Sequence, residues 1–333
     1  MPMIENIFKF PVWSWHIEIS SKCMLKCPRC PRTENPSSSI NKELELEFFL
    51  KNFPSIFVHK FVEKIMFCGN DGDPIYSKDL IKVIEYFKKI KPSIEITIIT
   101  NGSYRKNNWW IDLSNVLDYN DTVIFSIDGY DDESNNLYRV NSNWDSIELG
   151  ITTLVSHSKC KTVWAVIPFS FNQDKLDLMQ SKAESLGMTG FQITYSNKFD
   201  GQYMIDNKDH LKPNDQFISA PGQYSRQYTD LSKNSRSNTQ VNRLILNHKK
   251  IMINKIKPKC INGDGYGLFI NSLGEFYPCC WIASRYNSNS NWSTLGKKFN
   301  IRQQSLMSVL IDDLWDNTAL FTESAECQSK CAT

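Results

Sequence analysis

Three cysteines near the start of the chain, Cys23, Cys27 and Cys30, are spaced as Cys-x3-Cys-x2-Cys. They follow directly on an alternating apolar stretch that includes Ile17 and Ile19. Three thiols this close leave one over if two of them form a disulfide, whereas three thiolates are soft ligands suited to an iron–sulfur cluster. A 4Fe–4S cube held by three cysteines keeps one iron open, and an open iron can bind a ligand through nitrogen and oxygen.

A zinc site is the alternative explanation for these cysteines. Zinc in structural sites has four ligands, which commonly come from two Cys-x2-Cys or Cys/His pairs. No fourth ligand lies near the three cysteines in the sequence except His16. The spacing therefore favours the iron–sulfur interpretation.

A second group of cysteines lies towards the C-terminus. Cys260 and Cys279 flank residues 267–277, which alternate apolar positions around an Asn-Ser-Leu-Gly turn and predict a β-hairpin. A hairpin brings its flanking residues to one end, as shared metal ligation requires. Cys327 and Cys331 follow near the end of the sequence. Four such thiolates suit a tetrahedral zinc site or a second iron–sulfur cube.

The composition limits the classes of function. The 333 residues include 38 Lys and Arg against 36 Asp and Glu, so no strong net charge favours a nucleic-acid or membrane partner. Residues 1–10 contain an acid and lack the apolar core of a signal peptide, and no apolar run is long enough to span a membrane. Ten cysteines are then best explained by a reducing compartment, and we expect a cytoplasmic protein.

Short β-branched runs alternate with longer amphipathic ones along the first two thirds of the chain. Six strands are predicted, at Trp15–Ser20, Val62–Cys68, Ile94–Thr100, Thr122–Ile127, Thr162–Ile167 and Gly190–Tyr195. Five helices are predicted, at Lys42–Asn52, Lys78–Ile90, Asn108–Leu117, Asn143–His157 and Gln173–Leu186. This alternation implies an α/β fold of parallel strands with helices packed outside. Ligands in such folds bind at the carboxyl ends of the strands.

Glycine or polar residues follow three of these strands. The motifs are Gly72-Asp73-Pro74 after the second strand, Thr100-Asn101-Gly102 after the third, and Ser126-Ile127-Asp128-Gly129 with Arg139 after the fourth. A glycine turn lets backbone carbonyls approach a ligand ammonium, and a guanidinium can donate two hydrogen bonds to a carboxylate. The plainer alternatives are a helix cap for Asp73 and a solvated helix position for Arg139.

Together these motifs resemble the radical S-adenosylmethionine (radical SAM) superfamily, over about Trp15 to Tyr195. The resemblance implies a partial (β/α)6 barrel, predicted over residues 1–200. It also implies that the first three cysteines hold a 4Fe–4S cluster whose open iron is chelated by the amino and carboxylate groups of SAM. One departure is Arg29, which stands where the family usually has an aromatic residue.

The resemblance assigns a SAM-binding role to each strand-end motif. By position, Gly72, Asp73 and Pro74 would hold the SAM amino group, and Thr100 and Asn101 would contact the ribose. Ser126 and Arg139 would bind the SAM carboxylate, and Asp128 would contact the ribose or the substrate. Ile167 would lie against the adenine.

The C-terminal spacing Cys-x13-Gly-x4-Cys, with Gly274 between the cysteines, resembles the opening of a SPASM domain. Most later cysteines of that domain are missing, so the shorter twitch variant matches better. It implies an auxiliary 4Fe–4S cluster held by Cys260, Cys279, Cys327 and Cys331, with Cys280 as the alternative to Cys279. We expect this hairpin-plus-helix domain over 260–333, after a polar linker or active-site cover over 201–259.

The resemblance implies an enzyme that cleaves SAM reductively to a 5′-deoxyadenosyl radical and abstracts hydrogen from a substrate C–H bond. We expect a peptide or protein side chain as the substrate, as in ribosomal-peptide maturases and sulfatase-maturing enzymes. Asp128 and Tyr195 are the predicted catalytic residues. The alternatives are a twitch-type alcohol dehydrogenase acting on a sugar or aminocyclitol, and a non-catalytic iron–sulfur electron carrier. The expected partner is a reductant such as flavodoxin or ferredoxin. For leader binding the enzyme would use a separate leader-binding protein or none.

Overall fold

A computed structural model describes residues 14–34, 41–196, 199, 210–219, 226–232, 268–283, 290–312 and 327. The chain divides into two compact units. The first unit comprises Met1–Cys23, Ser39–Ile98 and His248–Thr333, and the second comprises Met24–Ser38 and Ile99–Asn247. Both units combine parallel strands with helices, as expected for an α/β fold.

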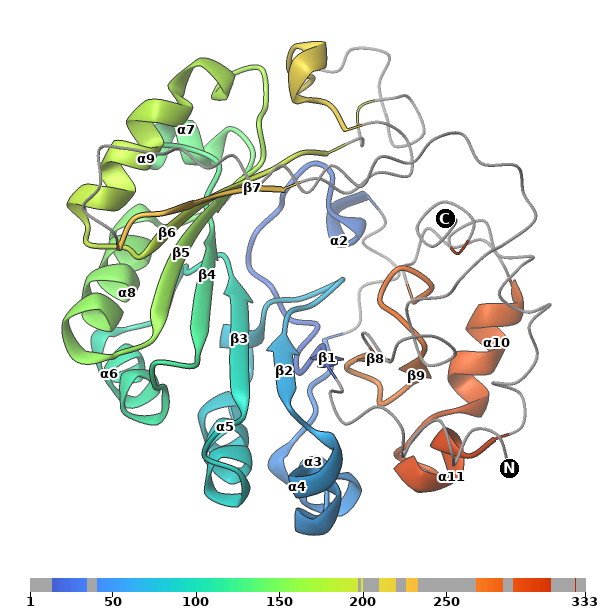
Figure 1. Ribbon diagram of the computed structural model, residues 1–333. Helices are drawn as coiled ribbons and strands as arrows, with labels where there is room; N and C mark the ends of the chain where they lie inside the picture. Colours follow the sequence, from blue (N-terminus) through green and yellow to red (C-terminus); the bar gives the residue numbers. More distant parts are fainter. Residues whose placement is uncertain are drawn as a thin grey trace. The chain divides into compact units, whose positions relative to one another are not determined.

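The first unit contains a mostly parallel sheet with the strand order β3–β2–β1–β8–β9 (Figure 1). Its strands are β1 (Ser14–Ile17), β2 (Lys64–Phe67), β3 (Glu95–Thr100, the last two residues of which belong to the second unit), β8 (Leu268–Ile270) and β9 (Phe276–Tyr277). Trp15 of β1 lies opposite Ile65 on one side and Leu268 on the other. The predicted hairpin therefore extends the sheet that begins with β1.

Helices of the first unit enclose a core of aromatic rings. The helical elements are α3 (Leu46–Asn52), α4 (Ser55–Phe61), η2 (Pro74–Tyr76), α5 (Leu80–Ile90), α10 (Ser290–Lys298) and α11 (Leu306–Leu310). The ring of Trp15 meets those of Phe53 and Phe57 edge-on at 5.1 and 5.7 Å, and Phe53 meets Phe87 of α5 at 5.6 Å. Such edge-to-face contacts add to the free energy gained by burying the rings.

The second unit contains the strand order β7–β6–β5–β4. Its elements are α2 (Pro31–Glu34), α6 (Asn107–Val116), β4 (Thr122–Ser126), α7 (Asp132–Asn136), α8 (Trp144–His157), β5 (Lys161–Val166), η3 (Gln173–Lys175), α9 (Leu176–Ser185), β6 (Gly190–Thr194), η4 (Asp215–Phe217) and β7 (Arg226–Asp230). Strands β4, β5 and β6 are parallel, and β7 is antiparallel to β6. Helices α6, α8 and α9 lie on the same side of these strands (Figure 1).

The predicted fold class is confirmed, because all six predicted strands and all five predicted helices are present with bounds that differ by a few residues. Three of the features that were not predicted concern how these elements are connected and paired. Helix α4 is separate from α3 because Pro54, its N-cap residue, disfavours a helical conformation at the residue before it. Strand β7 lies within the segment predicted as a linker or cover. Finally, β8 pairs with β1, so the C-terminal hairpin belongs to the same compact unit as β1.

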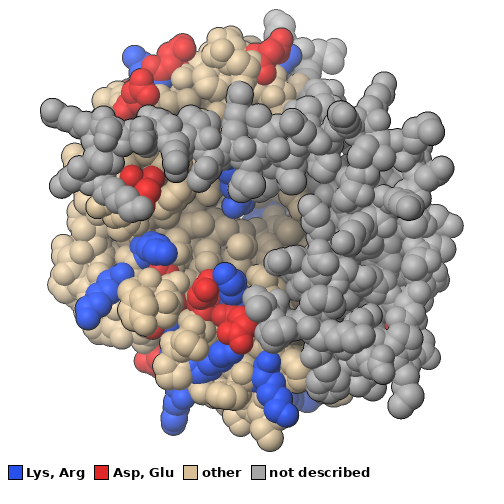
Figure 2. Space-filling model, viewed as in Figure 1, with Lys and Arg blue, Asp and Glu red and all other residues tan. Residues whose placement is uncertain are grey.

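The surface of the described residues agrees with the balanced composition. On the face shown in Figure 2, basic and acidic side chains are interspersed among uncharged ones. Within the described part of the chain, no helix has both the length and the apolar character that crossing a membrane would need.

We expect Gly150→Ala to destabilise the second unit by about 1–2 kcal/mol, although alanine is the better helix former. A Cβ atom at Gly150 of α8 would lie 2.6 Å from two ring atoms of Trp110, a fully buried side chain of α6. Urea unfolding followed by circular dichroism measures the change. Thr152→Ala, at an exposed position of the same helix, is the control and is expected to change stability only slightly. A Gly150→Ala protein as stable as the wild type would contradict this packing.

Candidate functional site

The cysteines of the N-terminal motif fall on both sides of the boundary between the units. Cys23 is the last residue of the first unit's opening segment, and Cys27 and Cys30 belong to the second unit. A tight turn joins the latter two, because the amide of Cys30 donates to the carbonyl of Cys27 at 3.0 Å. The amide of Lys26 donates to the carbonyl of Val140 at 2.9 Å, which fixes the cysteine loop beside Arg139.

Cys27 is buried, with 8% of its surface exposed. Desolvation by burial raises the pKa of its thiol to about 11, and the positive charge of the neighbouring Arg139 acts in the opposite direction. No three His, Cys, Asp or Glu side chains within the described ranges are gathered as for a metal ion. The donor chemistry nevertheless suits an iron–sulfur cluster, since soft sulfur ligands stand near the guanidinium of Arg139, whose positive charge can balance the charge of thiolates.

Arg139 is held by a buried ion pair with Asp128. Its Nε donates to Oδ2 of Asp128 at 2.6 Å, and Oδ1 of Asp128 accepts the amide of Ile167 at 2.8 Å. The Asp128 side chain has 0% of its surface exposed, and that of Arg139 has 18%. Burial works against the charged guanidinium, but the attraction of Asp128, Cys27 and Tyr138 together outweighs it and raises the pKa of Arg139. At Asp128, by contrast, burial is the main cause of a raised pKa.

The loop after β4 is built to hold this pair. The side-chain oxygen of Asn135 accepts the amides of Asp128 and Gly129, at 2.9 and 3.1 Å. A Cβ atom at Gly129 would lie only 2.0 Å from the backbone nitrogen of Asn135, so the close approach requires glycine. Asn172 Nδ2 donates to the carbonyl of Asp128 at 2.7 Å. Asp128 therefore contacts Arg139 and the amide of Ile167, and its predicted contact with ribose or substrate stays a prediction.

The other predicted residues of the second unit lie at strand ends. The Thr100 hydroxyl oxygen accepts the amide of Gly102 at 3.0 Å, and Oδ1 of Asn101 accepts that of Ser103 at 2.9 Å, so both side chains brace the turn after β3. Ser126 ends β4 and is half-buried, as is Ile167 just after β5. Tyr195 follows β6, and its hydroxyl donates to Oε1 of Gln227 on β7 at 3.1 Å.

In the first unit, the glycine turn over residues 69–74 follows β2. Asp73 Oδ1 accepts the amide of Ile75 at 3.1 Å and caps η2, which begins at Pro74. The capping role considered from the sequence is therefore present. Sequence reasoning missed Glu18, whose buried carboxylate accepts the amides of Asp71 and Gly72, at 2.7 and 3.2 Å. The only signal in the sequence was an acid between two apolar residues, Ile17 and Ile19.

Residues 17–180 match the family model described as the radical SAM superfamily. These residues form a radical SAM domain. No curated protein matches the chain in sequence. The family implies binding of SAM and of one 4Fe–4S cluster.

Solved structures share the fold of this chain at low sequence identity. Streptococcus suis SuiB bound to S-adenosylmethionine matches with a TM-score of 0.59 and 15% identity, covering 92% of this chain and 67% of that one. The structure of anSMEcpe with bound AdoMet and the Cp18Cys peptide matches with a TM-score of 0.54 and 13% identity, covering 96% and 88%. BtrN in complex with AdoMet and 2-DOIA matches with a TM-score of 0.44, 13% identity and coverages of 97% and 91%, a similarity too low to support an argument.

The C-terminal cysteines of the chain are only partly described. Cys279 and Cys280 are half-buried after β9, and Cys327 is buried. Cys260 and Cys331 lie outside the described residues, so the predicted four-cysteine set stays a prediction. Asn70, in the glycine turn after β2, donates through Nδ2 to the carbonyl of Cys280 at 3.0 Å.

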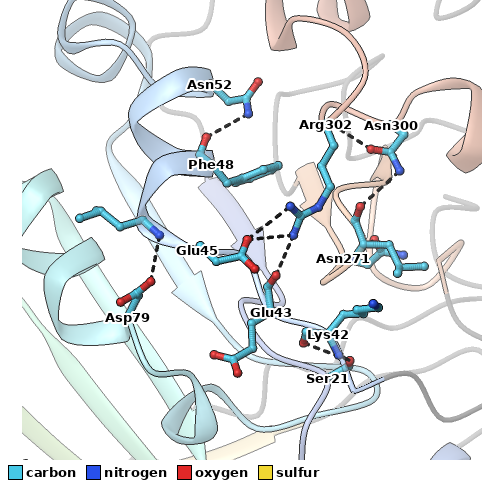
Figure 3. A network of polar contacts seen from close by, with 12 residues as sticks. Ser21, Lys42, Glu43, Glu45, Phe48, Asn52, Asp79, Asn271, Asn300 and Arg302 are labelled. Atoms are coloured by element: carbon cyan, nitrogen blue, oxygen red, sulfur yellow. Dashed lines mark hydrogen bonds and ion pairs between the residues drawn. The ribbon is translucent and has the colours of Figure 1, made fainter.

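Arg302 attaches the C-terminal segment to the start of α3 within the first unit (Figure 3). Its Nη2 donates to the carbonyl of Glu43 at 2.7 Å, and both Nη atoms lie 3.3 Å from Oε2 of Glu45. The guanidinium also lies over the ring of Phe48, 5.4 Å from its centre. Asn300 accepts the amide of Arg302 at 2.9 Å, which orients the loop that presents the guanidinium. These contacts fix the segment that contains the hairpin before Cys279.

Proposed function

We propose that this protein is a radical SAM enzyme that modifies or oxidises a peptide or protein side chain. The observation that carries the proposal is the buried Cys27 beside the Arg139–Asp128 ion pair, in a domain of the radical SAM superfamily. The structural neighbours support the peptide class, because SuiB is described bound to the precursor peptide SuiA and anSMEcpe bound to the Cp18Cys peptide.

Cys23, Cys27 and Cys30 would hold the 4Fe–4S cluster of this enzyme. When bound, the cluster and SAM supply a 5′-deoxyadenosyl radical that abstracts hydrogen from the substrate. Arg139 balances the negative charge of the thiolates, and its partly exposed guanidinium can donate to the SAM carboxylate. Asp128 keeps that guanidinium in place through its two accepted hydrogen bonds.

The remaining strand-end residues would bind SAM and substrate. Gly72, Asp73 and Pro74 are proposed at the amino group, Thr100 and Asn101 at the ribose, Ser126 at the carboxylate and Ile167 at the adenine. Tyr195 is proposed at the substrate, because its hydroxyl stands at a strand end, where ligands of such folds bind, and is oriented by Gln227. An auxiliary 4Fe–4S cluster held by the four C-terminal cysteines would exchange an electron with the substrate.

The test of the proposal starts with anaerobically reconstituted protein, reduced with dithionite and mixed with SAM. Formation of 5′-deoxyadenosine and about eight irons per chain are expected, since two cubes hold four irons each. Deuterated peptide and sugar pools then distinguish the substrate classes. Deuterium is expected to pass from the peptides into 5′-deoxyadenosine. Transfer only from the sugars would support the small-molecule dehydrogenase, and loaded clusters without any 5′-deoxyadenosine would support the electron carrier.

A further inference from the structure

Glu18 is a buried carboxylate directly after β1 in the first unit, with 2% of its surface exposed. Its Oε1 accepts the amides of Asp71 and Gly72, at 2.7 and 3.2 Å. Its Oε2 accepts the amide of Ser272 over a longer distance of 3.5 Å. The amide of Glu18 itself donates to the carbonyl of Ile270 on β8 at 2.8 Å. One residue thus contacts both the glycine turn and the C-terminal hairpin.

The glycine turn is packed tightly against this carboxylate. A Cβ atom at Gly69 would lie 2.8 Å from Oε1 of Glu18 and 2.6 Å from the carbonyl oxygen of Gly72. A Cβ atom at Gly72 would lie 2.1 Å from the carbonyl oxygen of Ser20. All three distances are shorter than real side chains allow, so the path of the turn depends on two glycines and on the position of Glu18.

The hydrogen bonds to Glu18 also set the direction of the turn's carbonyl groups. In a trans peptide unit the N–H and C=O groups point in opposite directions. Because the amides of Asp71 and Gly72 point at Glu18, the carbonyls of the preceding residues, Asn70 and Asp71, point away from it. Backbone carbonyls oriented together in this way are suitable acceptors for an ammonium group.

A second contact ties the same turn to the cysteine-bearing segment. Asn70 donates through its side chain to the carbonyl of Cys280, and the hairpin turn is closed by the amide of Gly274, which donates to the carbonyl of Asn271 at 2.9 Å. Ser272, which donates to Glu18, is buried inside that hairpin turn. A displacement of the hairpin would therefore change the donors that hold Glu18 and, through it, the glycine turn.

We propose that Glu18 is a positioning residue that orients the glycine turn for the ammonium group of SAM and couples this turn to the hairpin before Cys279 and Cys280. The inference rests on the proposed function, since it assigns a task at the SAM site. A carboxylate is the suitable group because it accepts hydrogen bonds through both oxygens. A glutamine would turn an NH2 group towards the amide of either Ser272 or the glycine turn, and one contact would be lost.

The protonation of Glu18 provides a readout in the wild-type protein. Desolvation by burial, followed by the charge of Asp71 in the facing turn, raises the pKa of Glu18 to about 7. Ser272 and Ile270 face it from the hairpin and carry no charge. Protonation removes acceptor capacity from the carboxylate, so SAM affinity is expected to fall as the pH drops from about 8 to about 6.

The test compares Glu18→Gln with wild-type holoprotein in anaerobic equilibrium dialysis against SAM and against 5′-methylthioadenosine, which lacks the amino-acid moiety. The variant is expected to bind SAM about tenfold more weakly, to bind 5′-methylthioadenosine like the wild type, and to lose the pH dependence. In assays of 5′-deoxyadenosine formation, the variant is expected to have a higher KM for SAM than the wild type and a nearly unchanged kcat. Hydrogen exchange is expected to speed up in both residues 69–74 and 271–274.

Asp79→Asn is the matched control, because Asp79 is a buried carboxylate of the same unit that accepts the amide of Leu46 at 3.2 Å. It is expected to bind SAM like the wild type. If Glu18→Gln weakens SAM and 5′-methylthioadenosine equally, or leaves SAM binding unchanged at every pH, this inference is wrong although the proposed function stands. If the wild type neither binds nor cleaves SAM, the proposed function is wrong, and the inference fails with it.

Discussion

Replacing Cys27 by alanine is expected to lower 5′-deoxyadenosine formation by more than about 100-fold, because even changes around metal ligands cost 10–100-fold. Cys27 is the buried cysteine of the N-terminal motif, and the charge of Arg139 lowers the pKa of its thiol against the effect of burial. Without this thiolate, the cube would be held by two cysteines, and iron content is expected to fall by about four per chain. Iron and sulfide analysis together with chromatography of the SAM cleavage products measures both effects.

Cys160→Ala is the matched control for this variant. Cys160 lies in the same unit, is buried like Cys27, and has a thiol pKa that burial likewise raises to about 11. Its removal is expected to cost about 1 kcal/mol of stability while iron content and SAM cleavage stay at wild-type levels. A Cys27→Ala protein that kept its iron and still formed 5′-deoxyadenosine would rule out Cys27 as a cluster ligand. If both variants lost iron and SAM cleavage to the same extent, the cause would be the cavity that each substitution leaves rather than the loss of a cluster ligand.

The sequence was sufficient to predict the parallel strands because their apolar, β-branched pattern is strong. It was insufficient for β7, whose residues Arg226–Asp230 are polar and have no apolar period. That strand is held by backbone pairing with β6 and by Tyr228, whose ring covers Gly190: a Cβ atom there would lie 2.4 Å from the Tyr228 hydroxyl. A pairing that depends on a distant glycine leaves no local signal in the sequence.

The pairing of β1 with β8 and the role of Glu18 were hidden for a related reason. The hairpin was predicted from its own alternation, but its neighbour in the sheet lies at the other end of the chain. Glu18 was not singled out from the sequence, where it is only an acid in an apolar strand. The task proposed for it depends on the amides of Asp71, Gly72 and Ser272, which the fold brings to it. Backbone donors carry no residue-type signature, so sequence reasoning could not foresee them.

For the strand-end motif that contains Asp128 and Arg139, the sequence predicts which residues belong to the site but not how each side chain is used. The pattern assigned both residues to one predicted site, and the structure shows them in direct contact. It could not show that Asp128 has no exposed surface and is directed at Arg139 and the amide of Ile167. Burial is a property of the packed fold, and therefore a carboxylate that positions another residue looks the same in the sequence as one that binds a ligand.

Asp128→Asn is expected to destabilise the protein by about 3–5 kcal/mol, because it leaves the guanidinium of Arg139 without its buried counterion. Asparagine can still accept the amide of Ile167 through its oxygen, but its NH2 group would then face Nε of Arg139, donor against donor. Urea unfolding of the apo-protein, followed by circular dichroism and fluorescence, measures the free energy of unfolding. The double variant Asp128→Asn with Arg139→Gln removes both charges and therefore the mismatch. Its loss in free energy of unfolding is expected to be about 2 kcal/mol smaller than the sum of the losses in the two single variants.

The half-exposed pair of Lys182 and Glu148 in the same unit, with 3.2 Å between Nζ and Oε1, provides the comparison for this double-mutant cycle. Solvent screens such a pair, so the cycle with Glu148→Gln and Lys182→Gln is expected to give a coupling energy below about 1 kcal/mol. If the coupling between Asp128 and Arg139 were equally small, Asp128 would not hold the guanidinium in place. The proposed role of Asp128 would then fail, and its carboxylate would again be available for the predicted contact with ribose or substrate. A large coupling confined to the buried pair would instead establish that Arg139 is fixed before SAM binds.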